Sequence, residues 1–134
     1  MSQSKVRIAV VDDEPSVAKL IARVLRMHDY EVWVAPDCKT LITAVAESPD
    51  CIDLLVTDQS MPEMTGAELM KVARTHAPQL PVLLITGYSA EIARSGVQSW
   101  GYSAYLTKPL DIQLLLQQVS QLLCSASAHG ANAP

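Results

Sequence analysis

The chain alternates between two patterns of apolar residues, one short and continuous, the other longer and spaced at intervals of three or four residues. The continuous runs are rich in β-branched residues and are bounded by Asp, Gly and Pro, which is typical of buried strands. The spaced pattern places apolar side chains on one face of a helix. Strands are therefore predicted at residues 6–11, 32–35, 52–57, 82–86 and 103–107.

Helices are predicted between these strands and after the last one. The run 82–86 is the most hydrophobic strand, so we place it in the centre of the sheet. Segment 89–97 has few apolar residues and predicts a weak fourth helix, whereas the last helix has a strong apolar stripe that ends at Leu123. This alternation favours right-handed crossovers and an α/β fold, a doubly wound parallel sheet of five strands. Five strand–helix units are too few for an eight-fold barrel.

Composition narrows the class of protein. A chain of 134 residues is expected to form one domain, and its net charge of −4 argues against bulk attraction to nucleic acid or to anionic membranes. The three cysteines are widely spaced, which suggests neither a disulfide framework nor a zinc site. No apolar run approaches the ~18 residues of a membrane span. We expect a soluble cytoplasmic domain at residues 1–124 and a flexible tail at residues 125–134.

Polar residues end four of the five predicted strands, at the sheet edge where such folds bind ligands. If the first and third strands are neighbours, the carboxylates of Asp12, Asp13 and Asp58 share one crevice, where each is disfavoured unless a cation joins them. A hard divalent ion, Mg²⁺ or alternatively Mn²⁺, suits such oxygen ligands. Thr86 adds a hydroxyl donor and Lys108 a compact cation. The cluster therefore suits a phosphoryl group and the formation of an aspartyl phosphate.

Four sequence motifs carry a resemblance to the receiver domain of bacterial two-component response regulators. Their order and spacing fit that family over about residues 5–123. The resemblance implies a flavodoxin-like (βα)5 fold with strand order 2-1-3-4-5. The motifs are VVDDE at 10–14, LLVTDQSMPEMTG at 54–66, LLITG at 83–87 and YLTKP at 105–109.

The resemblance implies a phosphoacceptor and a metal site. Asp58 is the expected phosphoacceptor. Asp13 is expected to bind Mg²⁺ directly and Asp12 to bind it through water, while the backbone carbonyl of Ser60 completes the protein ligands. In this family the position of Ser60 also tunes the lifetime of the phosphoryl group.

The resemblance also implies a conformational switch. Lys108, with Pro109 after a cis bond, is expected to neutralise phosphoryl charge, and Thr86 is expected to move toward the phosphoryl group. The space that Thr86 leaves can admit the ring of Tyr105, the expected switch aromatic. Tyr88 is at the second lifetime-tuning position, where its ring is expected to shield the acyl phosphate from water.

Partners follow from the same resemblance. The phosphoryl donor is expected to be a sensor histidine kinase or a histidine phosphotransfer protein, and the output a protein bound by the fourth helix, fifth strand and last helix. The domain is expected to catalyse only its own phosphoryl transfer and dephosphorylation, as a monomer or weak homodimer. Two motifs look most like receivers of hybrid sensor kinases. Because eleven residues follow Leu123, we expect either a stand-alone receiver or one excised from a longer chain.

Three other functions fit the predicted sheet less well. A nucleotide or flavin binder needs a Gly-rich loop after the first strand, where this chain has DDEP. A Mg²⁺-dependent aspartyl phosphatase needs a second carboxylate two residues after its nucleophile, where this chain has Ser60. An interaction module that has lost phosphorylation would not be expected to keep the whole polar cluster.

Each polar residue also has an ordinary explanation when taken singly. Asp12 and Asp13 can be a helix entry with Glu14 as the cap. Asp58 can be a turn residue after a strand, and Lys108 a surface lysine. Their convergence at one predicted sheet edge favours the functional interpretation.

Overall fold

The computed structural model describes residues 6–87 and 104–132, with side chains through residue 124. The predicted helix at 89–97 lies outside the described residues. The described elements follow one another in the order β1 (Arg7–Val11), α1 (Pro15–Met27), β2 (Glu31–Val34), α2 (Cys38–Glu47), β3 (Leu54–Asp58), α3 (Gly66–His76), β4 (Val82–Thr86), β5 (Ala104–Thr107) and α6 (Ile112–Asn132).

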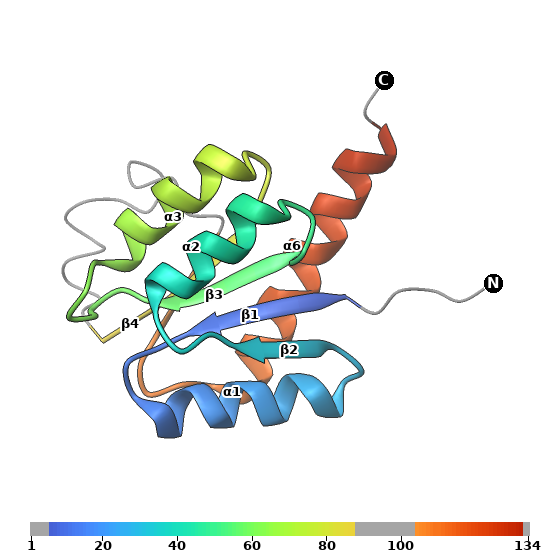
Figure 1. Cartoon of the computed structure of the whole chain (residues 1–134). Helices are drawn as coiled ribbons and strands as arrows, with labels where there is room; N and C mark the ends of the chain where they lie inside the picture. Colours follow the sequence, from blue (N-terminus) through green and yellow to red (C-terminus); the bar gives the residue numbers. More distant parts are fainter. Residues whose placement is uncertain (1–5, 88–103, 133–134) are drawn as a thin grey trace, which may run out of the picture.

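The five strands form one parallel sheet in the order β2-β1-β3-β4-β5, which confirms the predicted topology. Helices α2 and α3 cover one face of the sheet, and α1 and α6 cover the other (Figure 1). Because all strands run in the same direction, their carboxyl ends lie along one edge. The sheet therefore presents the residues that follow β1, β3, β4 and β5 side by side.

Alternation along β1 serves both faces of the sheet. Ala9 packs in the core beneath α2 and α3, while Ile8 and Val10 pack in the core beneath α1 and α6. Strands β3 and β4 are buried along their whole length, as expected for interior strands of a parallel sheet. The central strand is β3, and β4 lies next to it. The segment 82–86, which was predicted to be central, is therefore an interior strand one position from the centre of the sheet.

The starts of α2 and α3 have specific side-chain caps. At α2, the carboxylate of Asp37 accepts a 2.7 Å hydrogen bond from the amide of Thr40. At α3, Thr65 and Glu68 form a reciprocal capping box. These caps satisfy amide groups that would otherwise lack partners in the first helical turn. The capping box also fixes the residue at which α3 begins.

Helix α6 is longer than the predicted last helix. Its backbone is helical through Asn132, so residues 125–132, which were expected to form a tail, continue the helix. Whether this segment is flexible stays a prediction. Within the part of the chain that the structure describes, no helix is both long and apolar enough to cross a membrane.

The exposed edge of β2 is partly blocked by a side chain. The guanidinium of Arg26 donates a 2.8 Å hydrogen bond to the carbonyl of Val32. An edge strand with open backbone groups invites pairing with another chain, and charged side chains over the edge reduce that tendency. The β2 edge is therefore less open to strand addition than its position in the sheet suggests.

Gly66 is required by the close approach of α3 to the end of β3. A Cβ atom at this position would lie 2.6 Å from the carbonyl oxygen of Asp58 and 2.8 Å from a methyl carbon of Leu84. The amide of Gly66 also donates a 3.0 Å hydrogen bond to the carbonyl of Gln59. The missing side chain thus lets the first turn of α3 pack directly on the strand that carries Asp58.

Replacing Gly66 by alanine tests this packing. Gly66→Ala is expected to lower the free energy of unfolding by about 1–3 kcal/mol through overpacking, despite the better helix propensity of alanine. Gly87→Ala is the control, because a Cβ atom there meets no atom of the described residues within 4 Å. Urea denaturation of both variants measures the difference. Equal stability of the two variants would contradict the packing argument.

Candidate functional site

The carboxyl edge of the sheet brings together residues from opposite ends of the sequence. Val11 of β1 pairs in register with Thr57 of β3, so the residues that follow them, Asp12 and Asp58, lie side by side. Lys108 follows β5 and reaches the same place, with its Nζ atom 3.6 Å from Oδ2 of Asp58. The predicted convergence of these three side chains is therefore present in the structure.

Three carboxylates crowd this edge. Asp12, Glu14 and Asp58 each offer an oxygen atom, and these oxygens all lie within 4.8 Å of one another. Asp58 is buried, Asp12 is half-buried and Glu14 is exposed. Asp13, which was expected to be a direct metal ligand, is exposed, and its carboxylate is among the groups that raise the pKa of Asp58. Glu14, which was considered only as a helix cap, belongs to the cluster.

The two carboxylate oxygens of Asp12 are in different environments. Its Oδ1 atom accepts a 2.8 Å hydrogen bond from the amide of Glu14. Its Oδ2 atom is buried and has no hydrogen-bond partner among the residues that the structure describes. A buried oxygen without a partner is costly, and a cation is a natural ligand for it. Burial also raises the pKa of Asp12, against the lowering effects of the Glu14 amide and of Lys108.

The electrostatics of the site centre on Asp58. Burial, followed by repulsion from Asp12, raises its pKa to about 6, although Lys108 acts in the opposite direction. The amide of Ser60 donates a 3.4 Å hydrogen bond to Oδ1 of Asp58, which also favours the charged form. Asp58 is therefore ionised at neutral pH but is held in a destabilised charged state.

Lys108 is shared between two acidic partners. Its Nζ atom donates a 2.9 Å hydrogen bond to Oε1 of Glu14, shorter than its 3.6 Å contact with Asp58. Burial lowers the pKa of Lys108, but the hydrogen bond to Glu14 and the charges of Asp12 and Asp58 outweigh that effect, so the pKa is raised. Lys108 is thus a permanent cation at neutral pH.

The remaining predicted site residues lie on β4 and β5. Thr86 is buried at the end of β4, and its carbonyl accepts a 2.8 Å hydrogen bond from the amide of Lys108. The peptide bond between Lys108 and Pro109 is cis, as expected. Tyr105 is on β5 with 39% of its surface exposed. Tyr88 lies outside the described residues, so its expected shielding role stays a prediction.

Gln59 is a structural residue of the site that the sequence did not single out. Its side chain is buried, and its Oε1 atom accepts a 3.1 Å hydrogen bond from the amide of Ala67 in the first turn of α3. Its backbone amide donates to Ile85 of β4. Gln59 therefore ties the residue after Asp58 to both the helix and the neighbouring strand. A glutamine after a strand has no distinctive sequence signal for this role.

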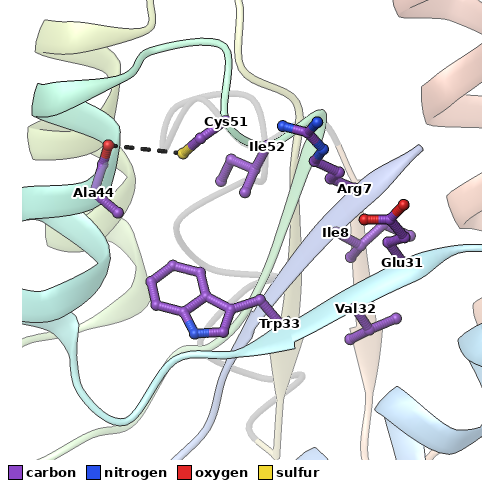
Figure 2. A pocket seen from close by; sticks show the side chains of 8 residues that line it. All are labelled: Arg7, Ile8, Glu31, Val32, Trp33, Ala44, Cys51 and Ile52. Carbon is purple, nitrogen blue, oxygen red and sulfur yellow. Dashed lines mark hydrogen bonds between the residues drawn. The ribbon is translucent and has the colours of Figure 1, made fainter. Parts of the chain in front are cut away.

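An apolar cavity lies at the opposite edge of the sheet. It has a volume of about 350 Å³ and is bordered by β2, α2 and the segment before β3 (Figure 2). Trp33, Ala44 and Cys51 line it, and the Cys51 thiol donates a 3.7 Å hydrogen bond to the carbonyl of Ala44. The amino ends of the strands form this edge, so the cavity is separate from the carboxylate cluster.

The sequence matches the family model of the response regulator receiver domain over residues 8–120. The chain belongs to this receiver domain family. The match includes every residue of the cluster at the carboxyl edge, and the five-stranded parallel sheet agrees with the fold of solved receiver domains. The resemblance inferred from the four motifs is therefore confirmed.

Individual relatives show the range of proteins that contain such a domain. The chain is 32% identical over 118 residues to the probable transcriptional regulatory protein TcrX of Mycobacterium tuberculosis, which covers 88% of this chain and 50% of TcrX. It also matches 27% of a ZraR transcriptional regulatory protein of Klebsiella oxytoca. The chain thus spans half or less of the length of these curated relatives.

Two solved structures are similar in both sequence and fold. The receiver domain of the hybrid histidine kinase CckA is 35% identical, with a TM-score of 0.72 and coverage of 87% of this chain and 98% of that one. The response regulator TrrA of Thermotoga maritima, solved in complex with Mg²⁺ and BeF, is 29% identical, with a TM-score of 0.75 and the same coverage of both chains.

The raised pKa of Asp58 predicts a specific pH dependence of stability. Because the folded pKa of about 6 exceeds the ordinary value of 3.8, the folded chain binds the proton more tightly, and stability falls as pH rises from about 4 through 6. Asp58→Asn removes this loss. Without divalent ions, the variant is expected to be more stable than the parent by about 1–2 kcal/mol at pH 7.5 and by less at pH 4.

Urea unfolding across this pH range measures the effect. Asp50→Asn is the matched control, because it removes one exposed carboxylate from a loop at the other edge of the sheet. The control is expected to follow the parent at every pH. A constant stability difference between Asp58→Asn and the parent from pH 4 to 8 would mean that the pKa of Asp58 is not raised in the folded protein.

Proposed function

We propose that this receiver domain accepts a phosphoryl group on Asp58 and uses it as a signal. The observation that carries the proposal is the placement of a buried carboxylate between a second acid, Asp12, and the ammonium of Lys108. With a pKa of about 6, the Asp58 carboxylate is ionised at neutral pH and is a competent nucleophile.

The residues present fit a divalent cation. The unpartnered buried oxygen of Asp12 and the crowding of carboxylates both favour a cation with oxygen ligands. We propose that Asp12, Asp13, Asp58 and the backbone carbonyl of Ser60 hold Mg²⁺, with Mn²⁺ as a substitute. The ion supplies charge neutralisation for the phosphoryl oxygens. The complex of the related TrrA with Mg²⁺ and BeF supports this assignment.

The chain's own residues then perform the transfer. An oxygen of the Asp58 carboxylate forms a bond to phosphorus as the bond from phosphorus to the donor nitrogen or oxygen breaks. The electron pair of that bond stays with the leaving group. Lys108 compensates negative charge on the phosphoryl oxygens, and the hydroxyl of Thr86 donates a hydrogen bond to one of them. No other covalent catalysis is required of the domain.

We propose a histidine kinase or a phosphotransfer protein as the phosphoryl donor, and the cytoplasm as the location of the domain. The proposed output surface includes β5 with Tyr105, α6 and the segment at 89–97. Curated relatives are transcriptional regulatory proteins, which supports a DNA-binding domain as a neighbour in some chains. The net charge of −4 argues against bulk attraction of this domain itself to DNA.

Labelling with a small phosphodonor tests the proposal. Incubation with acetyl phosphate and Mg²⁺ is expected to add one phosphoryl group, detected as a mass increase of the intact chain. Asp58→Asn and removal of divalent ions with EDTA are each expected to abolish the increase. Asp50→Asn should be labelled like the parent. Full labelling of Asp58→Asn would mean that the acceptor is another residue.

A further inference from the structure

The short ion pair of Lys108 is made with Glu14 and not with the proposed phosphoacceptor. The distance from Nζ to Oε1 of Glu14 is 2.9 Å, a good charge-assisted hydrogen bond, whereas 3.6 Å to Oδ2 of Asp58 is beyond ordinary hydrogen-bonding distance. These residues are 94 positions apart in sequence. The hydrogen bond to Glu14 therefore holds the Lys108 ammonium partly away from the carboxylate of Asp58.

Glu14 is at the N-cap position of α1, where a side chain often accepts hydrogen bonds from the first turn of the helix. It is the residue before the first turn of α1, but its carboxylate makes no capping hydrogen bond to that helix. Its backbone amide is fixed by Oδ1 of Asp12, and Pro15 begins the helix without needing a donor partner. The backbone of Glu14 is thus anchored to the acidic cluster while its side chain is directed to Lys108.

We propose that Glu14 is a positioning residue that holds Lys108 while Asp58 is unphosphorylated and must release it for phosphoryl transfer. This inference rests on the proposed function, since it concerns the same lysine. A phosphoryl group on Asp58 adds a charge of about −1.5 to −2, against −1 on Glu14. Lys108 therefore exchanges the exposed carboxylate for the phosphoryl oxygens, and Glu14 is left without its partner.

The difference in exposure makes this exchange favourable. The side chain of Glu14 is 57% exposed and that of Asp58 is 5% exposed. Water and salt screen an exposed ion pair, whereas a charge beside a buried group interacts more strongly. Breaking the contact between Glu14 and Lys108 therefore costs little free energy, but this cost adds to the barrier of every phosphoryl transfer. Glu14 thus sets part of the barrier to transfer.

Glu14→Gln tests the inference by keeping the side-chain length while removing the charge. At saturating Mg²⁺ and constant ionic strength, its initial rate of labelling by acetyl phosphate is expected to be about threefold higher than that of the parent. Glu14→Asp is expected to be faster as well, because its carboxylate is one methylene group shorter and the 2.9 Å contact with Lys108 is weakened. Glu47→Gln, which makes the same charge change at the far end of α2, should match the parent.

Two further measurements separate the possible outcomes. In a crystal structure of the parent with Mg²⁺ and beryllofluoride, Nζ of Lys108 is expected to contact a fluoride and to lie more than about 4 Å from Glu14. Persistence of the 2.9 Å pair in that complex, or parent-like rates in Glu14→Gln, would overturn the role of Glu14. So would a higher rate in Glu14→Gln alone, with Glu14→Asp like the parent. Failure of the parent itself to be labelled would instead overturn the proposed function.

Discussion

Repulsion among carboxylates at the carboxyl edge of the sheet is the constraint on which the site depends. Parallel pairing of β1 with β3 forces Asp12 and Asp58 together, because Val11 and Thr57 are partners in the register. The fold therefore places two acids side by side, one after β1 and one at the end of the fully buried strand β3. Burial makes each charge more costly, and it leaves the Lys108 ammonium and any bound cation as the groups that relieve the cost.

The surrounding structure holds the backbone around Asp58, the proposed acceptor, in place. Gly66 lets α3 pack against the backbone of Asp58, and Gln59 joins that helix to β4. The capping box of Thr65 and Glu68 fixes where α3 begins. On the other side, the amide of Lys108 is bonded to the carbonyl of Thr86, so the backbone of the lysine is fixed while its long side chain can change partners. A fixed acceptor and an adjustable cation are the arrangement that a phosphoryl-dependent switch needs.

Much of this arrangement could be predicted from the sequence, because it depends on local patterns. Strand–helix alternation gave the parallel sheet, and the positions of Asp12, Asp58 and Lys108 after strands placed them on one edge. Element ends were less accurate: β3 begins at Leu54 and not at residue 52. The extension of α6 through Asn132 was also missed, although alanine in residues 125–132 favours a helix.

What the sequence could not show is which of several polar partners a side chain selects. Glu14 had an ordinary local role as a helix cap, and nothing in the run DDEP distinguishes a cap from a partner of a lysine 94 residues away. That choice depends on the distance between the start of α1 and the end of β5, which only the packed sheet defines. Because the pair is made on the exposed side of the cluster, it is weak enough to be exchanged. A stronger, buried pair between Lys108 and Asp58 would neutralise the carboxylate that we propose as the nucleophile.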